Sequence, residues 1–126
     1  MDFNGTWQAY YEENLDDFLK AVDAPEMMAK MRRDVKPVIV IEQKGEDFTF
    51  TMKTPLCTIV NSFSTGKESE FTGLNGKKFK CTVREENGKL ITETDKFTSV
   101  REIQGEDMVE TFTAGSVRFL SKSKRI

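Results

Sequence analysis

The chain has 126 residues, of which 37% are hydrophobic and 32% charged, and its net charge is −2. These values predict one folded domain over residues 1–126, exclude a disordered chain and argue against a nucleic-acid partner. No apolar run approaches the roughly 20 residues of a membrane-spanning helix, and the start has neither a signal-peptide pattern nor a myristoylation glycine, so we expect a cytoplasmic protein.

The residues that commonly carry metal or nucleophilic chemistry are scarce. Histidine is absent, and Cys57 and Cys81 do not form a CxxC motif. A zinc site or a Cys/His nucleophile therefore lacks its usual parts, and we expect no metal, no cofactor and no enzymatic activity. We expect the two cysteines to be reduced, buried thiols.

The first third of the chain contains a strand over residues 5–13, followed by two short helices over residues 16–22 and 26–33. Apolar residues recur at helical spacing through both helices: Leu15, Phe18, Leu19 and Val22, then Met27, Met28 and Met31. Asn14 or Asp16 can cap the first helix, and Pro25 suits the first turn of the second.

After Pro37 the pattern becomes short alternating runs separated by turns that contain glycine. The clearest runs are residues 48–52, 77–84, 97–103, 108–113 and 117–123. This rhythm predicts an antiparallel meander. The helical pair is too small to cover a sheet of eight or more strands, so we expect the sheet to close into a β-barrel.

The alternation also predicts what the barrel contains. In the run 77–84 the charged Lys78, Lys80 and Arg84 mark the outer face, so the opposite parity faces inward. The predicted inward set is Phe48, Phe50, Met52, Lys77, Phe79, Cys81, Val83, Phe97, Ser99, Arg101, Ile103, Val117, Phe119, Ser121 and Ser123. Such a mixture predicts a water-filled cavity for a ligand with an apolar body and an anionic end, since buried unpaired charges are costly. Alternatively, an inward charge such as Lys77 sits at the barrel rim.

A hairpin through residues 104–107 fixes the register of two strands. A four-residue loop there sets Arg101 opposite Glu110 and Ser99 opposite Phe112, close enough for an ion pair inside the barrel. We expect this pair, with Lys77, Ser99 and Ser121 nearby, to hold water and the ligand's carboxylate or hydroxyl groups. The alternative is that Arg101 reaches the rim and Glu110 is protonated.

Several motifs together resemble one family over the whole chain. They are Gly5-Thr6-Trp7 through Asn14, Asp16, Phe18 and Leu19, then Lys53-Thr54-Pro55, Asn61-Ser62-Phe63, Gly66-Lys67-Glu68, Asp107-Met108-Val109-Glu110-Thr111 and the end from Ser121 to Ile126. The chain resembles the intracellular lipid-binding proteins, within their liver-type bile-acid-binding and fatty-acid-binding branch. The resemblance implies an all-β fold: a ten-stranded antiparallel up-and-down barrel, or clamshell, of two roughly orthogonal sheets, with a helix-turn-helix lid between the first two strands.

The resemblance also implies a portal formed by the second helix and the turns at residues 54–57 and 74–76. Ser121 stands where close liver-type relatives usually carry arginine, and Ser99 where bile-acid-binding relatives often carry histidine. Arg101 stands where several fatty-acid-binding relatives keep an inward arginine. The predicted ligand-binding residues are Met28, Met31, Leu56, Asn61, Phe63, Leu74, Lys77, Phe79, Ser99, Arg101, Glu110, Phe112, Phe119 and Ser121.

We therefore expect a monomeric intracellular carrier that binds bile acids or long-chain fatty acids without a covalent bond. One alternative is a lipid-modifying enzyme of lipocalin-like architecture, for which Glu110 with Ser99 or Ser121 is the inward candidate set. Another is a carrier of retinoids or other hydrophobic ligands. Lys30, Arg32 and Arg33 could give the lid a basic face for transient membrane contact, or could simply form a solvated helix surface.

Overall fold

The computed structural model describes residues 3–22, 36, 38–53, 58–72 and 78–126. Within these residues one short helix and ten strands follow one another. The elements are β1 (Gly5–Glu13), α1 (Leu15–Ala21), β2 (Val38–Lys44), β3 (Asp47–Lys53), β4 (Thr58–Ser64), β5 (Glu68–Thr72), β6 (Lys78–Glu86), β7 (Lys89–Glu93), β8 (Thr98–Gln104), β9 (Asp107–Ala114) and β10 (Val117–Arg125). In this described part of the chain, no helix is both long and apolar enough to span a bilayer.

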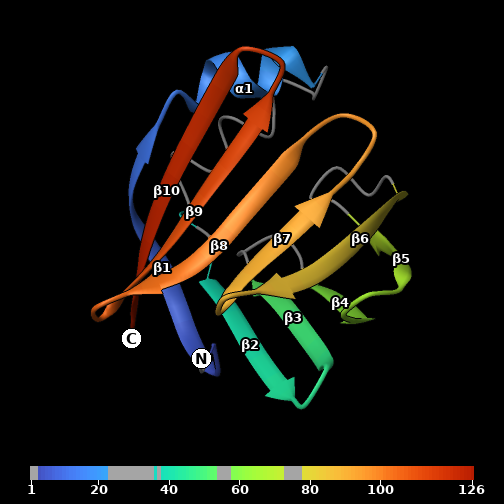
Figure 1. The fold of residues 1–126 in the computed structure, drawn as a ribbon. Coiled ribbons are helices and arrows are strands. Elements are labelled where there is room, and N and C mark those ends of the chain that lie inside the picture. The colour runs from blue at the N-terminus through green and yellow to red at the C-terminus, as the bar shows by residue number, and fades with distance from the viewer. Residues whose placement is uncertain (1–2, 23–35, 37, 54–57, 73–77) are drawn as a thin grey trace.

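The strands form one antiparallel sheet in the order β4-β3-β2-β1-β10-β9-β8-β7-β6-β5. The first and last strands pair directly, with Trp7 opposite Arg125 and Ala9 opposite Ser123. This pairing curls the sheet into a nearly closed barrel (Figure 1). The predicted all-β, ten-stranded, up-and-down barrel is confirmed.

The turn between β6 and β7 has the residues that its backbone conformation favours. β6 and β7 are joined by Asn87 and Gly88, which both have positive φ, 52° and 79°. A two-residue turn with two positive φ values matches the twist of a hairpin, and asparagine followed by glycine tolerates it best. The turn aligns Glu86 with Lys89 and starts the ladder between these strands.

A hydrophobic core closes the end of the barrel away from α1. Trp7, Ile41, Phe48 and Leu90 are almost fully buried there, and the indole of Trp7 donates a hydrogen bond to the Phe3 carbonyl at 3.0 Å. These side chains lie on the inward parity of their strands, as alternation predicts. We call this core, around Trp7 and Phe48, the packed floor of the barrel, because it fills one end of the interior.

The other end is covered by α1, which lies over β9 and β10 (Figure 1). A seven-residue helix is too short to be stable alone, so its stability comes from packing. Phe18 supplies much of that packing, because its ring lies 5.3 Å from Phe112, 5.6 Å from Phe119 and 5.7 Å from Phe97.

Two details of α1 differ from expectation. The helix begins at Leu15 and ends at Ala21, one residue earlier than predicted at both ends. Asn14 occupies the N-cap position with φ 61°, but its side chain makes no capping bond. Its amide instead donates to the carbonyl of Arg118 at 3.1 Å, which ties the start of the helix to β10. Of the two predicted caps, Asp16 lies inside the helix, and Asn14 occupies the N-cap position without the side-chain bond expected of it.

Several predictions lie outside the described residues. They concern the second helix with Met27, Met28, Met31 and the basic Lys30, Arg32 and Arg33, the portal turns with Leu56 and Leu74, and the inward placement of Lys77. Cys57 also lies outside them.

Candidate functional site: an interior cavity with a buried ion pair

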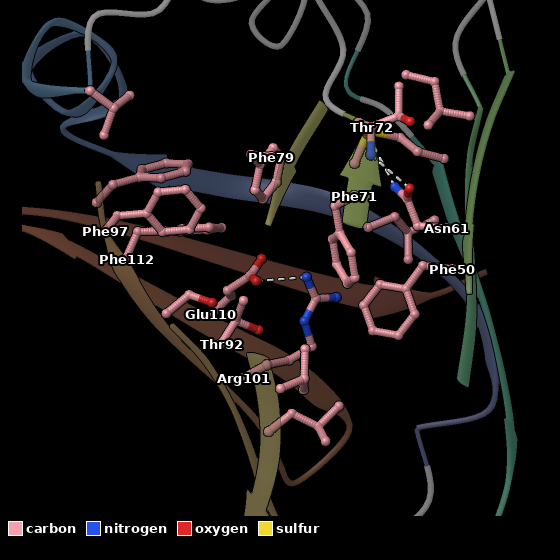
Figure 2. A pocket seen from close by; sticks show the side chains of 18 of the residues that line it. Phe50, Asn61, Phe71, Thr72, Phe79, Thr92, Phe97, Arg101, Glu110 and Phe112 are labelled. Carbon is pink, nitrogen blue, oxygen red and sulfur yellow. Dashed lines mark hydrogen bonds and ion pairs between the residues drawn. The ribbon is translucent and has the colours of Figure 1, made fainter. Parts of the chain in front are cut away.

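The barrel encloses a cavity of about 240 Å³ between α1 and the packed floor. Its described walls come from α1 and from the inward side of the strands (Figure 2). Eight of the predicted site residues line it: Asn61, Phe63, Phe79, Ser99, Arg101, Glu110, Phe112 and Phe119. Strand parity predicted the inward direction of Phe79, Ser99, Arg101 and Phe119, while Asn61 and Phe63 came from the family resemblance. That these residues contact a ligand stays a prediction.

Aromatic rings line much of this wall in an unbroken series, which we call the phenylalanine belt. Its members are Phe50, Phe63, Phe71, Phe79, Phe97, Phe112 and Phe119, and neighbouring ring centroids lie 5.2 to 6.2 Å apart. The belt passes from β3 through β4, β5 and β6 to β9 and β10. Contacts at these distances stabilise the wall, and the ring faces offer a hydrocarbon ligand a large apolar surface.

One ion pair interrupts this apolar wall. Nη2 of Arg101 lies 2.6 Å from Oε2 of Glu110, and the two side chains are only 10% and 15% exposed. They face each other because β8 and β9 pair in the register that the 104–107 hairpin predicts. The alternative in which Arg101 reaches the rim is therefore wrong.

Three contacts fix the position of the Arg101 guanidinium. Besides its bond to Glu110, it lies over the Phe50 ring, 4.9 Å from the centroid, and Nη1 donates to the sulfur of Met108 at 3.6 Å. Figure 2 shows the guanidinium between Glu110 and Phe50, with Phe71 nearby. A charge held in this way loses little further side-chain entropy when it binds a polar group.

A second, smaller cavity of about 90 Å³ shares the ion pair. Arg101 and Glu110 line both spaces, and Trp7, Ser121 and Ser123 line the smaller one. Its volume suits a few water molecules rather than a lipid chain. The sequence analysis predicted Ser121 in the polar centre. In the structure Ser121 lines the smaller cavity, next to the ion pair, and not the main cavity.

Glu12 joins this polar centre, and the sequence reading missed it. The pairing of β1 with β10 shifts between Ala9 and Tyr11, so two adjacent tyrosines point outward, 40% and 41% exposed, and Glu12 lies opposite Ser121. The hydroxyl of Ser121 donates to Oε2 of Glu12 at 3.3 Å. A β-bulge reverses the parity of every later residue in its strand. The adjacent Tyr10 and Tyr11, which break the alternation, were the available signal.

Asn61 has a role that its place in the wall alone does not reveal. In the described part of the barrel the backbone ladder stops between β4 and β5. Across this break, Nδ2 of Asn61 donates to the Thr72 carbonyl at 3.1 Å, and the Thr72 N–H donates to Oδ1 of Asn61 at 2.8 Å (Figure 2). The side-chain amide thus replaces a missing pair of backbone bonds.

Cys81 is buried beneath the cavity as a free thiol. Loss of solvent raises the pKa of the Cys81 thiol from 9.0 to about 11. This agrees with the predicted reduced, buried state and makes the group a poor nucleophile at neutral pH.

Comparison with known proteins finds one family that matches the whole chain. The model of the lipocalin / cytosolic fatty-acid binding protein family matches residues 1–126. Liver fatty acid-binding protein of Schroederichthys bivius is 48% identical over 126 residues, covering 100% of both chains. Gastrotropin of Mus musculus is 35% identical over 127 residues, covering 100% of this chain and 99% of the relative.

Solved structures agree at the level of the backbone. A zebrafish ileal bile acid-binding protein complexed with cholic acid superposes with a TM-score of 0.84 at 36% identity, covering 98% of each chain. The REP1-NXSQ fatty acid transporter Y128F mutant superposes with a TM-score of 0.92 at 26% identity, covering 99% of this chain and 98% of that one.

Proposed function

Because the chain belongs to the lipocalin / cytosolic fatty-acid binding protein family, we propose that it binds a fatty acid or bile acid in its barrel and carries it within the cell. The observation that supports this function is the composition of the cavity wall. The phenylalanine belt suits the apolar body of an amphipathic lipid, and the Arg101–Glu110 pair is a polar anchor for its head group. Burial of the body supplies most of the affinity, about 25 cal/mol for each Å² of apolar surface.

The names of similar proteins support the same ligand classes. The 48% identical relative is named as a fatty acid-binding protein, and the bile acid-binding protein was solved with cholic acid. The ligand's carboxylate or hydroxyl group would lie beside Arg101. A charge-assisted bond there would fix the orientation of the lipid.

The names of the relatives, which are fatty acid-binding proteins, support a carrier rather than an enzyme. The inward set proposed for an enzyme does not form a nucleophile beside a base: Glu110 is held by Arg101, while Ser121 donates to Glu12. The sequence has no histidine to activate a serine. Non-covalent binding is therefore the function that this interior supports best.

Calorimetric titration with oleate and with a conjugated cholate tests the proposal. We expect saturable binding to a monomer with a dissociation constant in the micromolar range or tighter, about −8 kcal/mol. Displacement of a fluorescent lipid by both ligands would assign them to one site. Absence of both heat and displacement would reject the carrier function.

A further inference from the structure

The charge balance of the polar centre has a consequence for the ligand. Arg101 is a fixed cation, but Glu110 lies 2.6 Å away and neutralises it. In the described lining of the two cavities these are the two ionisable charged side chains. Arg101 and Glu110 therefore contribute no net charge to the two cavities.

A carboxylate lipid disturbs this balance. Its head group can reach the guanidinium from the main cavity, and it then lies near the Glu110 carboxylate. Two carboxylates would share one guanidinium inside a wall of phenylalanine rings, which leaves one negative charge uncompensated. Burial of an unpaired charge is strongly unfavourable, and two carboxylates at one site favour protonation of one of them.

Among the residues that the structure describes, the groups around Glu110 do not remove the excess charge. Glu110 lies opposite Arg101 of β8 on one side and opposite Ser121 of β10 on the other. Ser121 in turn contacts a further carboxylate, that of Glu12 on β1. The cavity side chains of β3 and of α1, such as Phe50 and Phe18, are uncharged. Lys77 lies outside the described residues.

On the basis of the proposed function, we propose that Glu110 couples the binding of an anionic lipid to the uptake of one proton. A carboxylate lipid enters with a proton that Glu110 accepts, and Arg101 then pairs with the lipid carboxylate. A neutral lipid of the same chain length binds without a proton and uses the ion pair as it stands. Glu110 therefore sets the preference of the barrel between anionic and neutral head groups.

Calorimetry with laurate and 1-lauroylglycerol in buffers of different ionisation enthalpy tests this inference. Near pH 7 we expect uptake of about one proton per laurate and about none per lauroylglycerol. Laurate affinity should fall about tenfold for each unit of rising pH, because uptake of a proton is favoured by acid. These measurements need no variant, and laurate bound without proton uptake would overturn the inference.

Two variants test whether proton uptake depends on Glu110. Glu110→Gln leaves Arg101 free to balance the lipid, so proton uptake with laurate should vanish and laurate affinity should rise relative to lauroylglycerol. Glu102→Gln removes a carboxylate that pairs with Lys89 and does not line either cavity, and it should keep the wild-type uptake. Uptake that persists in Glu110→Gln would overturn the inference that Glu110 causes it. Failure of both lipids to bind and to displace each other would instead reject the carrier function itself.

Discussion

Arg101 and Glu110 show how a charged pair can be kept inside a β-barrel. Each group supplies the partner that the other needs, and Phe50 and Met108 fix the guanidinium further. Removal of one partner would leave the other buried and unpaired, which is more costly than the absence of both. The pair could be predicted from sequence because a hairpin loop of defined length fixes the register on both sides of it.

Replacement of Arg101 by leucine should separate anionic from neutral ligands. We expect oleate to lose about 1.5–3 kcal/mol of binding free energy, roughly tenfold to a hundredfold in affinity, because it loses a charge-assisted hydrogen bond. Oleyl alcohol should lose much less. Titration of both ligands measures the ratio.

The matched control is Arg118→Leu, which removes an exposed arginine from β10. It should leave both affinities close to wild type. An unchanged ratio of oleate to oleyl alcohol affinity in folded Arg101→Leu would show that Arg101 does not hold the head group.

The raised pKa of the Cys81 thiol leads to a second prediction about a single residue. In a Cys57→Ser variant, alkylation of Cys81 by iodoacetamide should still rise about tenfold per pH unit near pH 10, since the thiolate is half formed only at about pH 11. An ordinary thiol levels off near its pKa of 9.0. A pH profile of the alkylation rate that is flat above pH 9 would contradict the burial of this thiol.

β1 shows where alternation stops being a sufficient guide. Trp7 and Ala9 line the smaller cavity, and after the bulge between Ala9 and Tyr11 Glu12 lies opposite Ser121 and accepts its hydrogen bond. A bulge depends on the pairing of two strands that are more than a hundred residues apart, so the local pattern of one strand does not fix it. The hydrogen bond of the Asn14 side chain was not predicted for the same reason, because its partner, the Arg118 carbonyl, lies on β10.

The break between β4 and β5, like the bulge in β1, depends on how two strands lie together. Asn61 fits the predicted wall, but its two bonds to Thr72 depend on strands that do not pair through their backbones. Since both bonds of this amide cross the break, local opening of the barrel at Thr72 should depend on Asn61.

Replacement of Asn61 by aspartate should loosen this break. Aspartate keeps an acceptor for the Thr72 N–H, but it loses the donor and sets a carboxylate against the Thr72 carbonyl. We expect the opening free energy at Thr72 to fall by about 1–3 kcal/mol. Native-state hydrogen exchange of the Thr72 amide, followed by NMR, measures it.

Ser62→Ala is the control for this change, because Ser62 is an exposed neighbour on β4 that contacts Thr49 at 3.3 Å. It should leave exchange at Thr72 unchanged. Equal exchange rates at Thr72 in Asn61→Asp and wild type would mean that the amide does not hold the two strands together.

In the whole molecule, the cavity results from closure of a sheet whose inner face carries both rings and charges. One end is filled by the core around Trp7 and Phe48, and α1 covers the other through Phe18. Between them the phenylalanine belt surrounds a space that the side chains do not fill. Strand alternation predicted several of the residues that face this space, including Phe50, Arg101 and Phe119, while the position of α1 over its end depends on packing between distant elements.

The central claim is that this space holds the lipid with its head group at the Arg101–Glu110 pair. The most direct measurement is an isotope-edited NMR experiment with ¹³C-labelled oleate, which records contacts between lipid and protein protons. We predict contacts from the carbon next to the carboxylate to Arg101 and Phe50, and from the chain to Phe97 and Phe112. Contacts of that carbon confined to α1 or to the outer face of the strands, with none to Arg101, would contradict the account.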